Sequence, residues 1–293
     1  MNPLPSQLVS RPKISLDFLL ENALSRPESC NPYIKIVIEH TSAHDPRSVL
    51  RRLVACNDGV WKVFNHKSLK KEVTESMAML FALKKTLTKK FSGNVEKASD
   101  EEDVFDLEVL KRHQFTFYDI CSGRGIASII FRLFFPNSRV IMVDFNQSIN
   151  LEFLQASELS SIEFHHFDIY RPEFAEFLVS STSQDVANGS VSGIFGMHLC
   201  GQLSVRLIDL FNNISTIPIL VIFPCCMPRR KKGNNVDKMR LMLKNNGWDG
   251  YNFWSLDLFG SIQSSTSIKN IESDEYMESD KSKLIWALKR TAL

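Results

Sequence analysis

Residues 115–146 read FTFYDICSGRGIASIIFRLFFPNSRVIMVDFN, and the fold of the chain is decided by this stretch. Its first part, 115–121, is a dense run of aromatic and β-branched residues. Such a run predicts a strand that is buried on both faces of a parallel sheet. Ser122 to Gly125 then turn the chain with two glycines, at a place where bulky side chains would obstruct the backbone.

The remainder of the stretch completes a strand–helix–strand unit. Residues 126–135 carry apolar side chains at helical spacing until Pro136 ends the helix, and 138–145 form a second apolar strand. Glycines that precede a helix let backbone N–H groups approach a bound ligand closely. Asp144, near the end of the second strand and about 20 residues after the turn, suits the hydroxyl pair of a ribose. The unit therefore predicts a nucleoside-binding site.

Two classes of cofactor are bound by such a unit, dinucleotides and S-adenosylmethionine. A dinucleotide site needs a third glycine to seat its pyrophosphate. Here the glycines are only Gly123 and Gly125, and Ala127 and Ser128 follow them. A dinucleotide oxidoreductase is therefore the less favoured interpretation.

The spacing of Asp119, Gly123 and Gly125 resembles motif I, D-x-x-x-G-x-G, of the class I S-adenosylmethionine-dependent methyltransferases. In that family the acid faces the amino-acid end of the cofactor, and Asp144 matches the ribose-binding acid of motif II. Cys121 stands where many members have glycine, so the turn is expected to be less open. The resemblance implies S-adenosyl-L-methionine as the cofactor and these five residues as cofactor-binding.

Downstream of this unit, strands and helices alternate, which predicts an α/β sheet. Further strands are expected at 162–169, 193–199, 217–223, 251–259 and 283–289. The last two are separated by a polar loop, 260–282, and not by a helix. Seven strands that end in this way resemble the Rossmann-like sheet of class I methyltransferases, whose last strand runs antiparallel. The resemblance covers about residues 105–293.

Residues 1–104 differ in character and predict an N-terminal, mostly helical extension to a methyltransferase domain at 105–293. The elements expected in it are helices at 14–24 and 68–91, a helix that begins at Asp45-Pro46, and a short alternating strand at 33–39. The helix at 68–91 is amphipathic and has lysines opposite its apolar stripe. We interpret these lysines as solvated, with contact to phosphate as the alternative. The extension is expected to help form or cover the substrate site.

Composition sets broad limits on function. Hydrophobic content of 44%, charged content of 23% and a net charge of +2 are ordinary for a soluble globular protein, so a nucleic-acid partner must be argued from local clusters. The first residues contain no apolar signal segment, and no apolar run is long enough to span a membrane. The six cysteines show no C-x-x-C pair. We expect reduced thiols in an intracellular, cytoplasmic protein that does not bind membranes.

Histidine and cysteine side chains follow two of the predicted strands. HLCG occupies 198–201, and PCCMP occupies 224–228. Ligands bind outside the carboxyl ends of the strands in an open α/β sheet, so these side chains should share one edge with Cys121. His198 also falls beside the cofactor there, and because its ordinary pKa is close to neutral it suits a general base. The candidate catalytic residues are His198, Cys200, Cys225 and Cys226.

Two assignments at this edge have alternatives. The thiols and His198 could bind zinc, which prefers sulfur and nitrogen ligands in tetrahedral sets. Adjacent Cys225 and Cys226 are awkward for one tetrahedral ion, so we predict no metal site. Asp168 occupies the position at which the family places a group against the adenine amino group, but it could equally cap the helix that follows Arg171-Pro172.

The segment HLCG, followed later by the CC pair, is similar to a narrower group of eukaryotic methyltransferase-domain proteins, which includes tRNA 2'-O-methyltransferases. Those proteins have histidines after the CC pair, where this chain has Met227-Pro228. They also carry an N-terminal zinc-binding module, and the first hundred residues here hold no zinc-finger-type Cys/His set. This resemblance therefore implies the methyltransferase core and does not imply a tRNA substrate.

The methyl acceptor is expected to be RNA. A basic run directly follows the predicted strand at 217–223, on a loop that should border the substrate site, and consists of Arg229, Arg230, Lys231 and Lys232. A small molecule or a protein side chain is the alternative acceptor. The rival from another class is a catalytically silent relative that serves as a partner subunit, which the acids Asp119 and Asp144 argue against.

Overall fold

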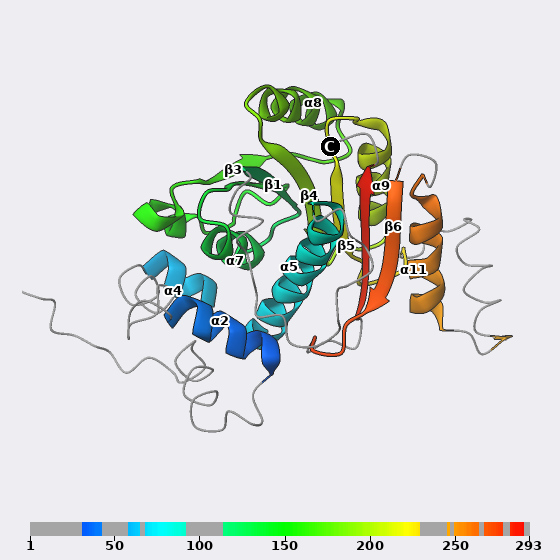
Figure 1. The fold of residues 1–293 in the computed structure, drawn as a ribbon, viewed down its shortest axis with the longest axis horizontal. Coiled ribbons are helices and arrows are strands. Elements are labelled where there is room, and N and C mark those ends of the chain that lie inside the picture. The colour runs from blue at the N-terminus through cyan, green and yellow to red at the C-terminus, as the bar shows by residue number, and fades with distance from the viewer. Residues whose placement is uncertain are drawn as a thin grey trace, which may run out of the picture.

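The computed structural model describes residues 31–42, 58–64, 68–91, 114–228, 245–246, 249–263, 267–277 and 282–289. Its centre is a seven-stranded sheet with helices on both faces (Figure 1). The strand order is β3-β2-β1-β4-β5-β7-β6. No helix in these ranges is both long and apolar enough to cross a membrane.

The sheet is parallel except for its last strand. The strands are β1 Phe115–Ile120, β2 Arg139–Asp144, β3 Ile162–His166, β4 Val191–Met197, β5 Ile219–Phe223, β6 Ser267–Ser273 and β7 Lys283–Lys289. Strands β1 to β5 pair in parallel, whereas β7 lies antiparallel between β5 and β6. This confirms the predicted fold class, a Rossmann-like α/β sheet of the class I methyltransferase type with an antiparallel last strand.

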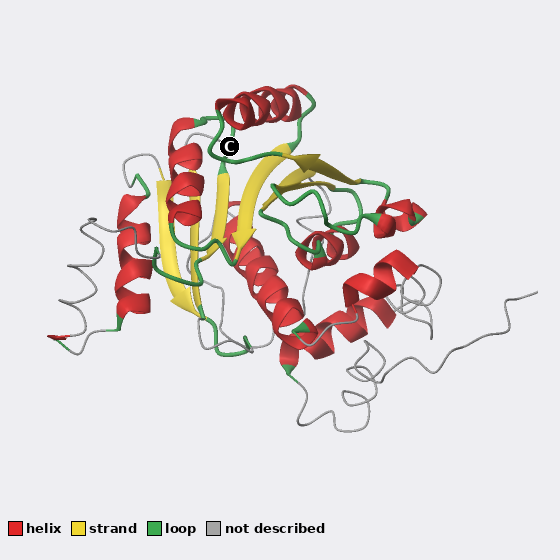
Figure 2. Ribbon diagram, turned by 180° about the vertical axis from the view of Figure 1, so that it is seen from behind, coloured by secondary structure: helices red, strands yellow, loops and turns green. Residues whose placement is uncertain are grey.

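Helices cover the sheet in two layers. The α-helices are α2 Pro32–Ser42, α4 Asp58–Phe64, α5 Leu69–Phe91, α7 Ile126–Phe134, α8 Pro172–Ala187, α9 Gln202–Asn213 and α11 Gly250–Ser261, and two 3₁₀-helices are η2 Glu152–Gln155 and η3 Ser157–Leu159. One hydrophobic cluster joins α2, α4, α5 and α7 to the first face of the sheet. A second cluster joins α8, α9 and α11 to the opposite face (Figure 2).

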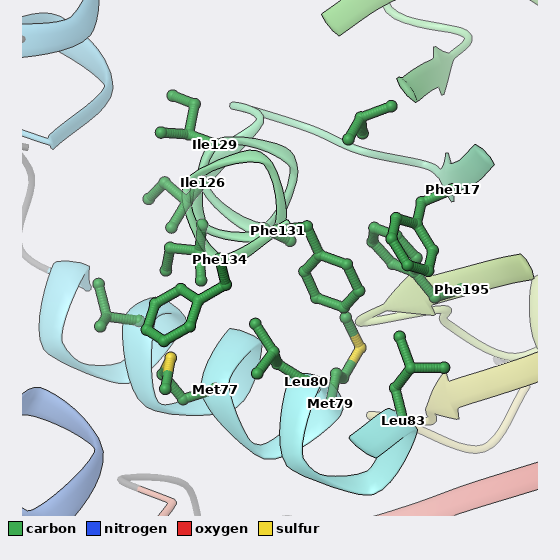
Figure 3. Close-up of a cluster of buried hydrophobic side chains, with 14 of the residues drawn as sticks. Met77, Met79, Leu80, Leu83, Phe117, Ile126, Ile129, Phe131, Phe134 and Phe195 are labelled. Atoms are coloured by element: carbon green, nitrogen blue, oxygen red, sulfur yellow. The ribbon is translucent and has the colours of Figure 1, made fainter. Parts of the chain in front are cut away.

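Helix α5 is the amphipathic helix predicted at 68–91, and its apolar stripe is buried. Met77 and Leu80 are fully inaccessible to solvent. Their side chains project, with Leu83, toward α7 and the sheet, where they meet a group of phenylalanines that includes Phe131 and Phe134 (Figure 3). On the other side of α5, Lys85 is exposed and forms an ion pair of 3.3 Å with Glu272 of β6.

The hydrophobic core is continuous across the predicted boundary between the extension and the methyltransferase domain. The same buried cluster contains Tyr33 of α2, Phe64 of α4 and Met79 of α5 together with Phe117 of β1 and Phe195 of β4. The helices α2, α4 and α5 therefore add a layer to the sheet. Whether 104 and 105 divide two domains stays a prediction, since the chain between α5 and β1 lies outside the described residues.

The short strand predicted at 33–39 is wrong, because these residues lie in helix α2. Tyr33, Ile34 and Val37 are buried at helical spacing in the cluster beneath the sheet. Pro32 is the first residue of the helix, where its missing N–H is not needed. Alternating β-branched residues fit a strand and a helix face equally well over so short a segment, and packing against α5 decides between them.

The strand predicted at 251–259 is also wrong, because these residues form helix α11. Asp249 caps the helix by accepting a hydrogen bond from the backbone N–H of Tyr251. Trp254 and Leu258, four residues apart, are buried against the second face of the sheet. The strand next to β7 is instead β6, which lies within the segment predicted as a loop. It is an edge strand with Ile268 half exposed, so its sequence is more polar than that of a buried strand.

The helices predicted at 14–24 and from Asp45-Pro46 lie outside the described residues. The same holds for the basic run 229–232.

We expect the substitution Leu80→Ala to lower the free energy of unfolding by about 2 to 5 kcal/mol, because it leaves a cavity between α5 and the sheet. Urea denaturation followed by circular dichroism measures this loss. Lys85→Ala, on the exposed face of the same helix, serves as the control and should cost less than about 1 kcal/mol. Equal, small losses in both variants would mean that α5 is not part of the core.

Candidate functional site

The predicted site residues lie at the edge of the sheet where the parallel strands end. Cys121 follows β1, His198 follows β4, and Cys225 follows β5. Cys121 and His198 have positive φ angles, 58° and 57°, which are uncommon for residues other than glycine. Backbone strain of this kind is found at functional sites when the surrounding structure enforces it.

The two glycines after β1 have different roles. Gly125, with a φ of 82°, leaves no room for a side chain: a Cβ there would lie 2.8 Å from Cε of Met142 and 2.9 Å from Cζ of Phe153. Gly123, with a φ of 54°, faces open space, and no atom beyond its own chain neighbours lies within 4 Å of where its Cβ would be. Gly125 is thus required by the packing of the turn, whereas Gly123 leaves space for a ligand.

Asp144 connects the ends of β1 and β2. Its Oδ2 accepts a hydrogen bond of 2.9 Å from the backbone N–H of Gly123, and its Oδ1 accepts one of 2.8 Å from the N–H of Asn146. Each carboxylate oxygen has a further lone pair, so the group can still accept hydrogen bonds from a ligand. The predicted glycine turn and the predicted acid are therefore in direct contact.

A pocket with a volume of about 370 Å³ opens over this turn. It is lined by Lys62, Val63, Gly123, Arg124, Asn146, Ser148, Ile149 and Asn150. Its volume falls within the range of small-molecule and cofactor sites, about 300 to 1,000 Å³. Lys62 and Val63 belong to α4, so the N-terminal helices form part of its wall, and nothing in the sequence pattern connects α4 with this pocket.

Two exposed aromatic side chains lie near the predicted ribose and adenine acids. Phe145, directly after Asp144, is 68% exposed and stacks on His166 at 5.7 Å between ring centroids. Tyr170, two residues after Asp168, is half exposed. A large aromatic ring held in water beside a pocket offers a flat face to a base. The signal that could have identified Phe145 is its position immediately after a strand-end acid.

Asp168 does not cap α8. The N-cap of that helix is Arg171, without a side-chain cap. Asp168 instead accepts a hydrogen bond from the backbone N–H of Tyr170, and its second oxygen lies 3.7 Å from Nε of Arg171. The alternative of helix capping is therefore not realised, and the predicted contact with adenine stays a prediction.

Asp119 faces the interior of the protein. Its side chain is 1% exposed, and its Oδ2 accepts a hydrogen bond of 2.6 Å from Oγ of Ser128 in α7. Burial raises the pKa of Asp119 to about 7, with a smaller contribution from the Asp144 carboxylate. In this position the carboxyl fixes the first turn of α7 to β1, and its predicted contact with the methionine end of a cofactor stays a prediction.

His198 contacts a buried carboxylate that sequence reasoning did not find. Its Nε2 lies 2.8 Å from Oε2 of Glu75, which is on α5 and fully buried, while the His198 side chain is 34% exposed. Lys71, one turn earlier on α5, lies 3.7 Å from the other Glu75 oxygen. The N-terminal helix layer therefore supplies a charged partner to the predicted base.

A second acid on α5 also acts on this region. Glu72 is partly buried, and burial raises its pKa, while the charges of Arg124 and His198 act in the opposite direction. The beginning of α5 thus lies close to both the glycine turn and the strand end of β4. In the sequence, Glu72 and Glu75 look like ordinary polar positions of an amphipathic helix, and only the tertiary packing reveals their place.

The structure brings three of the predicted cysteines together. Sγ of Cys200 is 2.8 Å from Sγ of Cys225, which is 3.6 Å from Sγ of Cys226. Cys121 is not part of this group of ligand atoms. Burial, followed by the Asp144 and Asp119 carboxylates, raises the pKa of Cys121 to about 12, so this thiol is protonated at neutral pH and is not a nucleophile there.

No protein-family model matches the chain, and no curated protein matches it in sequence. Similar solved structures include the plantazolicin methyltransferase in complex with SAH, which is 11% identical over 93% of this chain and 99% of its own, with a TM-score of 0.43. A putative rRNA methylase from Clostridium thermocellum is 11% identical over 62% of this chain and 92% of its own, with a TM-score of 0.35.

A precorrin-6y C5,15-methyltransferase from Geobacter metallireducens GS-15 is 15% identical over 66% of this chain and 91% of its own, with a TM-score of 0.33. At these identities the neighbours identify neither the substrate nor the site residues of this chain.

We expect the stability of the Asp119→Asn variant, relative to that of the unaltered chain, to increase as the pH rises. The pKa of Asp119 is about 7 in the folded chain and 3.8 ordinarily, so between these values the folded chain holds a proton that the unfolded chain has released. Stability is therefore lost as the pH rises through this window. The asparagine can still accept the bond from Ser128.

Urea unfolding of both proteins at about pH 5 and about pH 8 measures the effect, which should be on the order of 3 kcal/mol in favour of the variant. A stability difference between the two proteins that is the same at both pH values would show that the carboxyl is not held protonated by the fold.

Proposed function

We propose that the chain is an S-adenosylmethionine-dependent methyltransferase that acts on RNA. The single observation that supports this most strongly is the hydrogen bond between the N–H of Gly123 and Asp144, beside an open pocket at the strand ends. A glycine turn without side-chain cover, held against a strand-end acid, is the arrangement that a nucleoside cofactor requires.

The residues present fit S-adenosylmethionine. Gly123 leaves space above the turn, and Asp144 keeps lone pairs for the ribose hydroxyls. The exposed ring of Phe145 offers a face to the adenine, and Asp168 could accept a hydrogen bond from the adenine amino group. Cys121 and Gly125 shape the turn through their positive φ angles, while Asp119 is buried beside it and binds Ser128.

S-adenosylmethionine, when bound, supplies the methyl group. The chain then has to position the acceptor in line and remove its proton, and positioning accounts for most of the rate of such a displacement. We assign the removal of this proton to His198, which follows β4 and has a backbone φ of 57°.

Glu75 would determine which ring nitrogen of His198 accepts the proton. A Glu75 carboxyl 2.8 Å from Nε2 favours the tautomer with its hydrogen on Nε2, which leaves Nδ1 to accept the proton from the acceptor; in the described residues this approach is an ion-pair contact and not a hydrogen bond. A carboxylate behind a histidine also stabilises the imidazolium that forms on proton transfer. Glu75 is therefore a positioning residue, and His198 is the catalytic residue.

RNA is proposed as the acceptor because basic residues continue from the site. Pro228 packs against Gly201 beside the cysteines, and the sequence runs from it directly into Arg229, Arg230, Lys231 and Lys232. A basic segment attached to the edge of a site favours a phosphate-bearing substrate. The half-exposed ring of Tyr170 adds a surface on which a base can stack.

Calorimetric titration with S-adenosylhomocysteine tests the cofactor, and NADH is the control. Binding of the first alone supports the proposal, and binding of neither favours a silent partner subunit. Transfer of a labelled methyl group from S-adenosylmethionine to RNA then tests the acceptor. Label that enters only protein or small molecules would refute the RNA assignment and leave the methyltransferase assignment in place.

Asp144→Ala should abolish binding of S-adenosylhomocysteine, because both the ribose contact and the anchor of the glycine turn are lost. The same titration measures this, with circular dichroism to verify that the variant folds. Asp257→Ala removes an exposed carboxylate of α11 on the opposite face of the sheet and should bind normally. Normal affinity in a folded Asp144→Ala would remove the ribose assignment.

His198→Ala should bind S-adenosylhomocysteine almost normally but lower kcat by about 100-fold or more, as expected for the loss of a general base. Glu75→Gln should lower kcat by less, and the double variant should be no slower than His198→Ala, since the two side chains act as one unit. Steady-state methyl transfer at saturating substrate measures both effects. Additive losses would show that Glu75 does not act through His198.

A further inference from the structure

Three thiols of the described chain form a compact group outside the cofactor pocket. The sulfur atoms of Cys200, Cys225 and Cys226 all lie within 4.8 Å of one another. Cys200 is exposed and the other two are partly buried. We infer that this group is a binding site for one soft divalent cation, with Zn²⁺ as the ion that its ligand type suits best.

The group is built by two loops that are fixed to each other. The backbone N–H of Gly201, after β4, donates a hydrogen bond of 2.9 Å to the carbonyl of Cys226, after β5. Gly201 has a φ of 57°, and a Cβ there would lie 2.9 Å from Cα of Pro228. Only glycine permits this close approach, so the segments HLCG and CCMP are held together by backbone contacts.

A side chain adds to this connection. The thiol of Cys225 donates a hydrogen bond of 3.4 Å to the carbonyl of His198. In the metal-free chain this bond brings Cys225 to the loop that carries Cys200, and its proton is released to solvent when a metal ion binds the thiolate. A set of ligands held in place before the ion arrives loses little freedom on binding.

The distances between the sulfur atoms suit a tetrahedral ion. Two thiolates, each about 2.3 Å from one Zn²⁺, are about 3.8 Å apart. Cys225 and Cys226 are separated by 3.6 Å, which is close to that value. Cys200 and Cys225, at 2.8 Å, would have to separate by about 1 Å, and Cys200 can do so because it is exposed on its loop.

Adjacent cysteines are awkward ligands for one tetrahedral ion, but in this arrangement their sulfur atoms can reach the same point. The sulfur atoms of Cys225 and Cys226 lie close to each other and to Cys200, although their backbones are consecutive. A disulfide between Cys200 and Cys225 is the competing outcome. It would use two of the thiols and would not account for the third, Cys226, within reach of the same point.

His198 is not part of this group of ligand atoms, and its Nε2 contacts Glu75 instead. Three protein ligands leave one tetrahedral position open, as in catalytic rather than structural zinc sites. That position can take water or a soft donor atom such as a thiol or an unprotonated ring nitrogen. The cation site goes beyond the proposed methyl transfer and does not depend on it.

Metal binding to the purified full chain tests the inference. The reduced protein is stripped of metal and titrated with Zn²⁺ in competition with a chromophoric chelator, and with Co²⁺ by absorption spectroscopy. We expect one ion per chain and, with Co²⁺, thiolate charge-transfer and intense tetrahedral ligand-field bands. Absence of binding, or octahedral Co²⁺ spectra without thiolate bands, would overturn the inference.

The variants Cys200→Ser, Cys225→Ser and Cys226→Ser should each weaken Zn²⁺ binding at least tenfold. Cys121→Ser is the matched control, since this thiol lies at the same edge but outside the group, and it should bind Zn²⁺ normally. Unchanged binding in the three variants would place the ion elsewhere. Mass spectrometry that finds Cys200 and Cys225 linked in the protein as purified from cells, without bound zinc, would favour the disulfide instead.

Discussion

The packing of α5 against α7 and the sheet is the interaction on which the rest of the structure depends. It buries Met77 and Leu80 completely, and these residues lie on the same helix as Glu75 and Glu72. The apolar contacts fix the helix, and the fixed helix holds a buried carboxylate 2.8 Å from His198. Hydrophobic burial thus provides the stability that holds a polar carboxyl group out of water, which is unfavourable by itself.

Much of the sheet could be predicted from the sequence because β1, β2, β4 and β5 are largely buried and read as mostly apolar runs. The glycine turn and Asp144 were likewise identified from local spacing, and the structure joins them by one hydrogen bond. Prediction was wrong for α2 and α11, where short apolar segments fit both a strand and a helix. It also missed β6, whose edge position leaves its residues polar and partly exposed.

The site was predictable only where its residues follow a strand. His198, Cys200 and Cys225 do so, and their common edge follows from the topology. Glu75 and Lys62 come from helices far away in the sequence, and their approach depends on how α4 and α5 pack, which no local pattern encodes. The structure adds a packing role for Asp119, which is buried and bonded to Ser128, and its predicted contact with a cofactor stays a prediction.

The placement of Glu75 has a consequence for how this protein can change during evolution. Many α/β enzymes alter their specificity by exchanging a peripheral segment while the sheet keeps the chemistry. Here α5 belongs both to the hydrophobic core and to the environment of His198. Loss or exchange of α5 would therefore deprive the sheet of packing and the histidine of its carboxyl partner in a single step, so α5 and the sheet are expected to be inherited together.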